Sequence, residues 1–492
     1  MGSTPIIPGF HPDPSVCRVG EDYYLVNSSF EYKPGVPIFH STDLTSWTQI
    51  GNVLDRDEQL FVPSSAGGGG IYAPTLRHHD GRFWMVTTNF NEIRRGHLIV
   101  HATDPAGPWS APVYTEGVLG IDPDLFWDED GTCYLTWTGY AADGMGLLQV
   151  PIDPETGALL GEPRRVWQGA GLANPEGPHV YRRGDWYYLL LAEGGTERGH
   201  AVTIARSRSL AGPWESNPAN PILSHRSTTH PVQNTGHADL VERADGSWAM
   251  VYLGVRPIGP TPGFHVNGRE TFLAGIAWVD DWPVVDEDRF EVPRWTNDTD
   301  DSFETAEFDL RWIGPGRRPA AFTSGAPGGG LTIKSDASGY RPLLATRVEQ
   351  QAWEARATLD SDGRLVLRVD EKHWAAVERR GDIVCARLVI GPVDQVVVQE
   401  TLPAGTVVLA LRSTPEPTGP IPLATTADQL QFGYCTADGF QSIATVDGRY
   451  FSTEVAGGFT GRVVGVEPLP GTPSTLLRRF QLQTINIESD QS

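Results

Sequence analysis

The stretch that decides the fold is Asp13-PSVCRVGEDYYLV, because four further copies of its pattern follow along the chain. Each copy has a small or polar lead residue, alternating apolar positions, a turn with Gly or Asp, and a second run rich in aromatic and aliphatic residues. This is the pattern of two β-strands joined by a tight turn. The other copies are Ala73-PTLRHHDGRFWMV, Asp122-PDLFWDEDGTCYLT, Glu176-GPHVYRRGDWYYLL and His237-ADLVERADGSWAMVY.

The spacing of these hairpins predicts how they are arranged in space. Their lead residues, at positions 13, 73, 122, 176 and 237, are 60, 49, 54 and 61 residues apart. A period of roughly 40–60 residues built from antiparallel strands is typical of the blades of a β-propeller. In a closed propeller the lead positions surround one axis, so Asp13, Asp122, Glu176 and His237 are expected to meet. The alternative, that these acids only cap strand starts, is disfavoured because a Pro or Gly follows each acid in register.

The composition favours an all-β chain of more than one domain. The 492 residues include 55 Gly and 39 Pro, and 10% are aromatic, which suits many short strands and tight turns. We therefore expect a five-bladed β-propeller over residues 1–293 and a polar linker over residues 294–302. A β-sandwich is expected over residues 303–492, where the blade pattern ends and short alternating strands continue.

Charge and motifs exclude several classes of partner. The net charge of −23 disfavours binding to nucleic acid and to anionic membranes. The four cysteines show no spacing with each other or with histidine that indicates zinc. No apolar segment of 18 residues and no N-terminal signal region is present, which predicts a cytoplasmic protein. The sequence is compatible with a homo-oligomer.

Three acids at one end of a propeller axis point to hydrolysis of a glycosidic bond. One carboxyl group must protonate the leaving oxygen, and a second must activate water or attack the carbon. Asp13, Asp122 and Glu176 each precede Pro or Gly, so the local backbone is stiff or sharply turned, which favours the fixed side-chain placement that such chemistry requires.

Nine motifs occur together and in order along the chain. They are Pro8-GFHPDPS, Ser28-SFEYKPGVPIFHSTDL, Tyr72-APTLRHHDGRFWMVTTN, Ile121-DPDLFWDEDG, Pro175-EGPHVY, Ala192-EGGT, Asn234-TGHADLV, Gly268-RETFL and, in the expected sandwich, Val446-DGRYFSTEVAGGFTGRVVG. Through them the chain resembles, essentially from end to end, glycoside hydrolase family 43 in its two-domain β-xylosidase/α-L-arabinofuranosidase branch.

The resemblance implies an exo-acting, inverting glycosidase. Such an enzyme would release xylose, arabinofuranose or both from the non-reducing ends of xylo- or arabinoxylo-oligosaccharides. Asp13 would be the general base that activates water, and Glu176 the general acid. Asp122 would orient Glu176 and raise its pKa, since a nearby like charge disfavours ionisation. No cofactor is expected to be required.

The resemblance also implies residues that bind the substrate. Arg269 would hydrogen-bond the terminal sugar; the alternative is an arginine on a surface loop. Phe30, Tyr72 and Phe459 would form apolar walls, with Tyr72 where family members often carry Trp. Phe459 would reach in from the sandwich; the alternative is an ordinary residue of the domain interface. His237 would lie deep in the channel beside a calcium ion or a water; the alternative is a histidine of the core.

Three other functions compete with this interpretation. The nearest is an α-L-arabinofuranosidase with no xylosidase activity. A retaining propeller glycosidase, such as a fructan hydrolase, would carry Asn-Asp-Pro and Arg-Asp-Pro motifs, which are absent here. A non-catalytic carbohydrate-binding propeller would have no need of the three acids.

Overall fold

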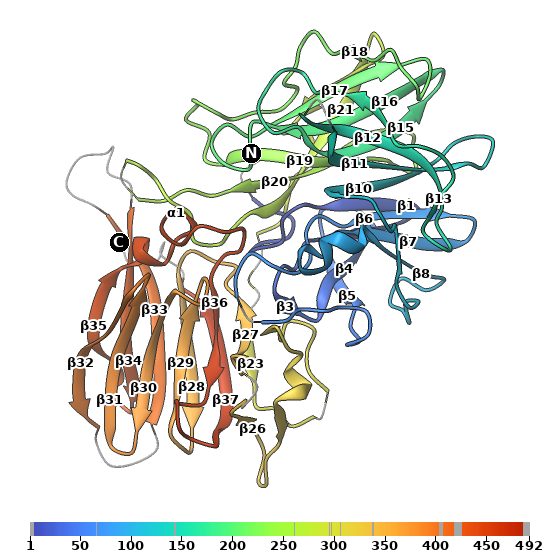
Figure 1. The fold of residues 1–492 in the computed structure, drawn as a ribbon. Coiled ribbons are helices and arrows are strands. Elements are labelled where there is room, and N and C mark those ends of the chain that lie inside the picture. Colours follow the sequence, from blue (N-terminus) through green and yellow to red (C-terminus); the bar gives the residue numbers. More distant parts are fainter. Residues whose placement is uncertain are drawn as a thin grey trace.

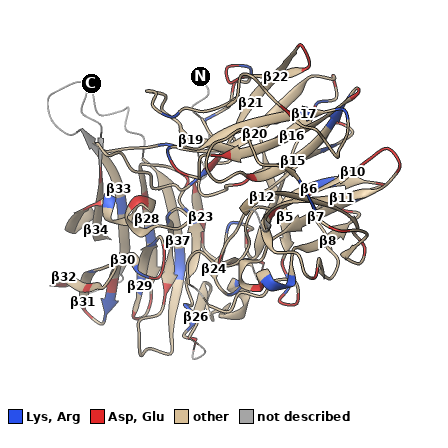
Figure 2. Ribbon diagram, turned by 45° about the horizontal axis from the view of Figure 1, so that its top comes forward, with Lys and Arg blue, Asp and Glu red and all other residues tan. Residues whose placement is uncertain are grey.

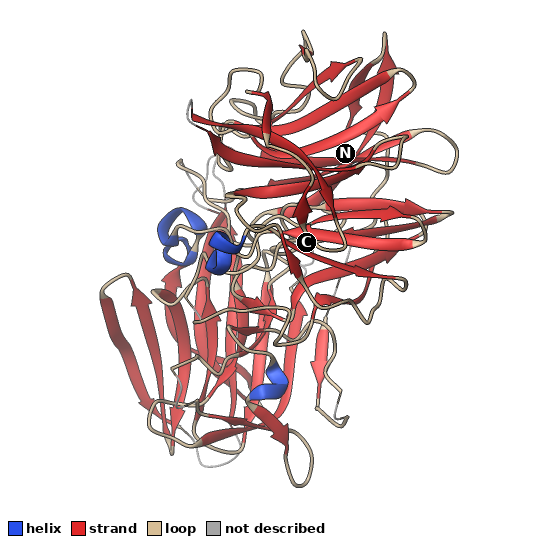
Figure 3. Ribbon diagram, turned by 45° about the vertical axis from the view of Figure 1, so that its right-hand side comes forward, coloured by secondary structure: helices blue, strands red, loops and turns tan. Residues whose placement is uncertain are grey.

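The computed structural model describes residues 4–64, 66–141, 144–259, 261–294, 296, 298–305, 307–336, 339–402, 407–417 and 426–485. Parts of the predicted linker (295 and 297) and the last seven residues of the predicted sandwich lie outside these ranges. Strands dominate the described residues, which confirms the all-β prediction (Figure 3). The helical segments described are η1 (Phe90–Arg95), η2 (Pro319–Ala321), η3 (Gly448–Phe451) and α1 (Thr453–Ala456).

The first part of the molecule contains one antiparallel sheet for each hairpin of the sequence repeat (Figure 1, blue to green). In chain order these sheets are formed by β1 (Ser15–Val19), β2 (Asp22–Val26), β4 (Gly35–Ser41) and β5 (Thr48–Leu54); β6 (Thr75–His79), β7 (Arg82–Thr87), β8 (Leu98–Ala102) and β9 (Val113–Tyr114); β10 (Gly120–Trp127), β11 (Cys133–Ala141), β12 (Gly144–Asp153), β13 (Ala158–Leu159) and β14 (Arg164–Trp167); β15 (Glu176–Arg183), β16 (Trp186–Glu193), β17 (Ala201–Ser207) and β18 (Glu215–Ser216); and β19 (Gln233–Glu242), β20 (Trp248–Val255), β21 (Glu270–Val279) and β22 (Trp282–Asp286).

The first strands of these sheets form a closed cycle. β1 contacts β6, β6 contacts β10, β10 contacts β15, β15 contacts β19, and β19 contacts β1 again. Buried apolar residues fill the space between each sheet and the next. The last of these layers packs Val16 and Leu25 of the first sheet against Val251 and Leu273 of the last. This is the arrangement of a β-propeller, in which face-to-face packing of sheets closes the ring.

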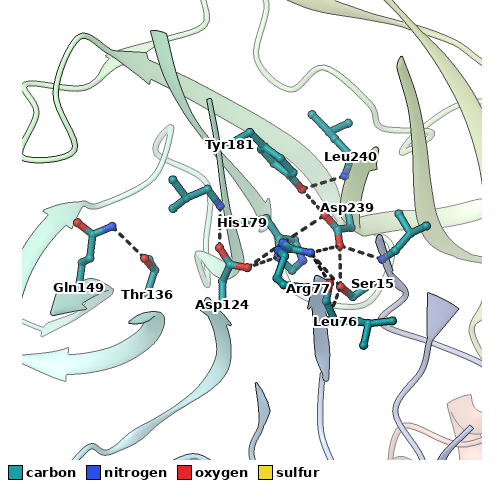
Figure 4. Close-up of polar contacts among 12 residues, drawn as sticks. Ser15, Leu76, Arg77, Asp124, Thr136, Gln149, His179, Tyr181, Asp239 and Leu240 are labelled. Carbon is teal, nitrogen blue, oxygen red and sulfur yellow. Dashed lines mark hydrogen bonds and ion pairs between the residues drawn. The ribbon is translucent and has the colours of Figure 1, made fainter. Parts of the chain in front are cut away.

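Hydrogen bonds and ion pairs join all five first strands at the axis (Figure 4). Ser15, Arg77, Asp124, Tyr181 and Asp239, one from each strand, form what we call the axial network. The Arg77 guanidinium lies 2.7 Å from Asp124 Oδ1 and 2.9 Å from Asp239 Oδ2. Asp239 also accepts hydrogen bonds from the hydroxyl groups of Ser15, at 2.6 Å, and Tyr181. Since Asp124 and Asp239 are fully buried, Arg77 supplies the positive charge that such carboxylates require.

The second part is a sandwich of two antiparallel sheets (Figure 1, yellow to red). Its core lies between them and includes Trp353, Leu367, Phe432 and Phe480. One sheet consists of β23 (Thr299–Asp301), β25 (Thr323–Gly325), β26 (Leu331–Lys334), β28 (Trp353–Leu359), β33 (Val407–Pro417), β34 (Thr426–Thr436), β35 (Gly439–Asp447) and β37 (Ser474–Thr484). The other consists of β27 (Leu344–Arg347), β29 (Gly363–Arg368), β30 (His373–Arg380), β31 (Ile383–Ile390), β32 (Val393–Thr401) and β36 (Val463–Glu467).

Short strands form two pairings that the sequence did not indicate. β3 (Tyr32–Lys33), from the first part, pairs with β24 (Gly314–Pro315) from the second. β23 lies inside the predicted linker and pairs with β37, so the sandwich sheet begins at Thr299. The sequence Thr-Asp-Asp carries no apolar alternation, and the position of β23 is set by its partner strand.

Charged residues occur throughout the described part of the chain. Figure 2 shows acidic and basic residues distributed over both parts of the molecule. Among the described residues, no helix has both the length and the apolar character needed to cross a membrane.

Candidate active site

One pocket gathers every site residue that the sequence predicted. Its lining comprises Asp13, Phe30, Tyr72, Ala73, Ile121, Asp122, Glu176, Thr196, His237, Arg269 and Phe459. All but Phe459 come from the propeller. The lead residues of all five hairpins are among them, as expected for equivalent positions around one axis.

The backbone is bent at the lead residues in a way that aims their side chains into the pocket. Asp13, Asp122 and His237 have φ angles of 54°, 55° and 46°, although residues with a Cβ rarely adopt positive φ. The pairing register also shifts between Ile121 and Asp124, between Glu176 and His179, and between Gly236 and Asp239. Such bulges redirect side chains and recur next to functional sites, as does backbone strain of this kind.

Asp13 is buried and held as a carboxylate. Its Oδ2 accepts a hydrogen bond from Ser28 Oγ at 2.5 Å, and its Oδ1 accepts one from the Arg269 guanidinium at 2.9 Å. Burial is the largest influence and alone would raise the pKa of Asp13, but Arg269, His237 and Ser28 together hold it below the usual value of a carboxyl group. Asp13 is therefore ionised at neutral pH and able to accept a proton.

Glu176 has the opposite electrostatic character. Burial, followed by the negative charge of Asp13, raises the pKa of Glu176 to about 7, while Arg269 acts in the other direction. The pair Asp13 and Glu176 thus contains one group that is ionised and one that retains a proton near neutrality. Two carboxyl groups with pKa values separated by their environments are what a general base and a general acid require.

Asp122 interacts with Glu176 through charge and with the backbone of the next residue, Gly177, through a hydrogen bond. Burial, and next the charge of Glu176, raise the pKa of Asp122 well above its usual value. The Asp122 carboxylate accepts a hydrogen bond of 3.1 Å from the N–H of Gly177, the residue after Glu176. Repulsion between two neighbouring carboxylates disfavours ionisation of both at once, so the two groups titrate as a pair.

His237 is a buried neutral imidazole close to Asp13. Its Nδ1 lies 3.7 Å from Asp13 Oδ1, and burial, the largest influence, lowers the pKa of His237 to about 4. Gly177 permits this position, because a Cβ there would lie 3.0 Å from His237 Nε2. Among the described residues, His237 belongs to no group of three acidic, histidine or cysteine side chains close enough to share an ion. Calcium prefers six to eight oxygen ligands, so a calcium ion beside His237 would need most of its ligands from water.

Aromatic rings and Arg269 form the remaining walls. Phe30 and Phe459 are stacked with ring centroids 5.6 Å apart, and Tyr72 lies edge-on to both. The Arg269 guanidinium lies 5.7 Å from the Phe30 ring centroid and 5.4 Å from that of Phe459. These two cation–π contacts hold the arginine in the pocket. Arg269 is thus buried, which excludes the alternative of a surface arginine.

Phe459 reaches the pocket because two glycine-containing segments pack backbone to backbone. A Cβ on Gly461 would lie 2.3 Å from the carbonyl oxygen of Asn267, and a Cβ on Gly268 would lie 2.8 Å from the amide nitrogen of Gly461. Only glycine permits this approach. It brings the loop that carries Phe459 against the segment that carries Arg269, so the second part of the chain completes the pocket wall.

Two polar residues at the site were not predicted as such. Thr196 lines the pocket, and its Oγ1 accepts a hydrogen bond of 3.0 Å from Arg269. Ser28 bonds directly to Asp13. Both lie in motifs that the sequence analysis quoted, but hydroxyl residues in loops are too common to single out without the fold.

Two carboxyl groups that face one pocket are typical of glycosidases, and comparison with known proteins identifies the family. The description "Glycosyl hydrolases family 43" matches residues 3–283, and "Beta xylosidase C-terminal Concanavalin A-like domain" matches residues 300–467. The chain therefore belongs to glycosyl hydrolase family 43 and is a glycosidase with a propeller and a C-terminal β-sandwich.

Relatives of known name fit this assignment. A xylosidase/arabinosidase of Butyrivibrio fibrisolvens is 44% identical over 350 residues, which are 66% of this chain and 66% of that protein. The non-reducing end alpha-L-arabinofuranosidase BoGH43B of Bacteroides ovatus is 37% identical over 94% of this chain and 90% of its own length.

Solved structures agree along the whole chain. The Bacteroides ovatus xyloglucan GH43B structure is 35% identical with a TM-score of 0.86, and the match covers 98% of this chain and 99% of that one. A xylan beta-1,4-xylosidase from Bacillus halodurans C-125 is 28% identical with a TM-score of 0.86, and covers 98% and 100%.

Proposed function

We propose that this protein is an exo-acting, inverting glycosidase that releases xylose, arabinofuranose or both from the non-reducing ends of xylo- or arabinoxylo-oligosaccharides. The observation that carries the proposal is the contrast between two acids in one pocket. The pKa of Asp13 is lowered, whereas that of Glu176 is raised to about 7. Such a contrast is unnecessary in a protein that only binds sugar, and it matches the needs of acid–base hydrolysis.

In the proposed reaction, Asp13 takes a proton from a water molecule as that water attacks the anomeric carbon. Glu176 donates its proton to the glycosidic oxygen as the bond to the leaving sugar breaks. Asp122 keeps Glu176 protonated through like-charge repulsion and holds its backbone through the Gly177 N–H. The reaction consumes one water and leaves the product sugar with inverted configuration.

The remaining wall residues are proposed to hold a single terminal sugar. Arg269 would donate hydrogen bonds to sugar hydroxyls from a position fixed by Asp13 and Thr196. Phe30, Tyr72 and Phe459 would cover the apolar faces of the ring. His237 would contribute as a neutral imidazole near the attacking water. The names of the relatives support pentosides as substrates, and both xylosidases and arabinofuranosidases occur among them.

Several broader assignments belong to the same proposal. We assign the catalytic unit, to about residue 293, as a five-bladed propeller, supported by the five sheets and their closed cycle of contacts. The sandwich unit then follows a short connection and begins at β23. Calcium beside His237, assembly into a homo-oligomer and a cytoplasmic location stay predictions, and the reaction as proposed requires no metal ion.

Product analysis tests the exo-acting pentosidase directly. With xylohexaose as substrate, we expect xylose and xylopentaose as the first products, because the proposed pocket holds a single terminal sugar. Arabinoxylan oligosaccharides, assayed in parallel, distinguish xylose from arabinose release. Early xylobiose and xylotriose would contradict exo action, arabinose as the only product would assign a sole arabinofuranosidase, and no product from either would support the non-catalytic alternative.

Asp122→Asn is expected to shift the pH profile in a defined direction. Glu176 must be protonated to act, so activity falls as pH rises through its pKa of about 7. Replacing Asp122 by a neutral amide removes a like charge and lowers the pKa of Glu176, so the alkaline limb moves to lower pH. The limb is measured as kcat/KM against pH for both proteins. An unchanged alkaline limb would exclude Asp122 from this role.

A further inference from the structure

A second cluster of potential ligands lies outside the catalytic pocket. His225 and His230 lie on the connection between β18 and β19, and Glu287 follows β22. Their ligand atoms all lie within 4.8 Å of one another, the only such group of three among the described residues. None of the three lines the pocket of Asp13 and Glu176. We propose that His225, His230 and Glu287 bind a zinc ion that links the connection between β18 and β19 to the segment after β22.

The side chains are close to the spacing that zinc requires. His225 Nε2 lies 2.9 Å from Glu287 Oε2, and the imidazole rings of His225 and His230 have centroids 3.8 Å apart. With bonds of about 2.0–2.2 Å to zinc, neighbouring ligand atoms of a tetrahedral site lie roughly 3.3–3.5 Å apart. Small side-chain rotations therefore suffice to place an ion between the three groups.

The surrounding hydrogen bonds orient the ligands as in metal sites. His225 Nδ1 lies 2.8 Å and His230 Nδ1 3.1 Å from the carbonyl oxygen of Val232. Donation from both Nδ1–H groups to this carbonyl leaves each Nε2 with a free lone pair. The Val232 N–H also lies 3.2 Å from His230 Nδ1, and metal binding at Nε2 selects the tautomer that donates. Glu287 Oε1 accepts a hydrogen bond of 3.0 Å from the buried Tyr252 hydroxyl, which directs Oε2 toward His225.

The chemistry of the group favours zinc over calcium or magnesium. Two imidazoles and one carboxylate are ligands typical of zinc, whereas calcium and magnesium prefer oxygen throughout. His225 is buried, while His230 and Glu287 are half-buried, so water can reach the fourth position. A simple ion pair between His225 and Glu287 would not require His230, which makes His230 the residue that distinguishes the two interpretations.

The position of the cluster defines what the ion would do. The connection that carries both histidines leads from the fourth sheet to the fifth, and Glu287 begins the segment that leaves the propeller toward the sandwich. These segments are 57 or more residues apart in the chain, so a shared ion would restrict their separation. Binding to the folded state alone raises thermal stability by mass action.

Zinc binding by the full-length protein and its variants tests the proposal. After dialysis against a chelator, each protein is equilibrated with Zn²⁺ alone at pH 7.5, and bound zinc is measured by mass spectrometry. His230→Ala and Glu287→Gln are expected to bind zinc at least ~10-fold more weakly than the unmodified protein, and Tyr252→Phe ~10-fold more weakly through loss of orientation. His40→Ala is the matched control, because His40 forms a similar pair with Asp22 at 2.7 Å but has no third ligand close by among the residues that the structure describes.

Two further readouts make the result independent of activity. Zinc is expected to raise the Tm of the unmodified protein and of His40→Ala but not of His230→Ala, and Co²⁺ should give the visible absorption of a tetrahedral site only in the first two. Thermal unfolding without metal identifies any variant that fails to fold. The substitution His230→Ala should disturb the fold little, because the His230 side chain is only half-buried. The proposal would be overturned if the zinc affinities of the unmodified protein and His230→Ala differed by less than 10-fold, or if neither protein bound zinc.

Discussion

Glu176→Ala is expected to lower kcat on xylo-oligosaccharides by about 10²–10⁴-fold, the usual contribution of a general acid. The loss should be much smaller on an aryl glycoside with a good leaving group, because a nitrophenolate departs without protonation. The fold should be retained, since Glu176 lies at the pocket surface and is not part of an apolar core cluster. Turnover on both substrates, together with the circular dichroism of the variant, provides the measurement.

Asp13→Ala serves as the matched comparison. The base acts on water, whatever the leaving group, so this variant should lose activity on both substrates by several orders of magnitude. Asp13→Ala also leaves Arg269 without its carboxylate partner, so KM is expected to change as well. If Glu176→Ala lost the same factor on aryl and natural substrates, Glu176 would not be the proton donor.

Arg77→Met is expected to destabilise the protein by about 3–5 kcal/mol, the cost of removing one partner from a buried ion pair. Arg77 lies between the fully buried carboxylates of Asp124 and Asp239, and no other guanidinium among the described residues contacts them. Met retains most of the apolar stem, so the effect reports mainly on charge. Urea unfolding of the propeller transition gives the measurement.

Arg82→Met is the control for this prediction. Arg82 pairs with Glu155 at 2.6 Å, but both side chains are more than a third exposed to solvent. An exposed pair of this kind contributes at most ~1 kcal/mol. Similar losses for the two variants would show that the axial network does not depend on buried charge.

The hairpin repeat could be found in the sequence because strand alternation and turn residues are local signals. It correctly predicted that Asp13, Asp122, Glu176 and His237 meet, since a closed ring brings equivalent positions together. The axial network was missed, although a signal existed. Asp124 and Asp239 lie two residues after lead residues, and alternate residues of a strand share a face. An acid repeated at that offset could have indicated a second ring of contacts.

Other features depend on the fold and have no signal in the local sequence. The positive φ angles of Asp13, Asp122 and His237 occur in residue types that usually avoid such angles, so the sequence does not indicate this backbone conformation. Phe459 was placed in the pocket chiefly by family resemblance, because its position follows from the close packing of Gly268 on Gly461. The zinc proposal joins His225 and His230 to a glutamate 57 residues further on, a spacing that no short motif contains.

The central claim is that Asp13 activates water for direct attack while Glu176 protonates the leaving group, and the configuration of the first product tests it most directly. Proton NMR can follow hydrolysis of an aryl β-D-xyloside faster than the released xylose mutarotates. The account predicts that α-xylose appears first and that β-xylose grows in afterwards. If β-xylose appeared first, the reaction would pass through a covalent intermediate, and the assignment of Asp13 as a base acting on water would be wrong.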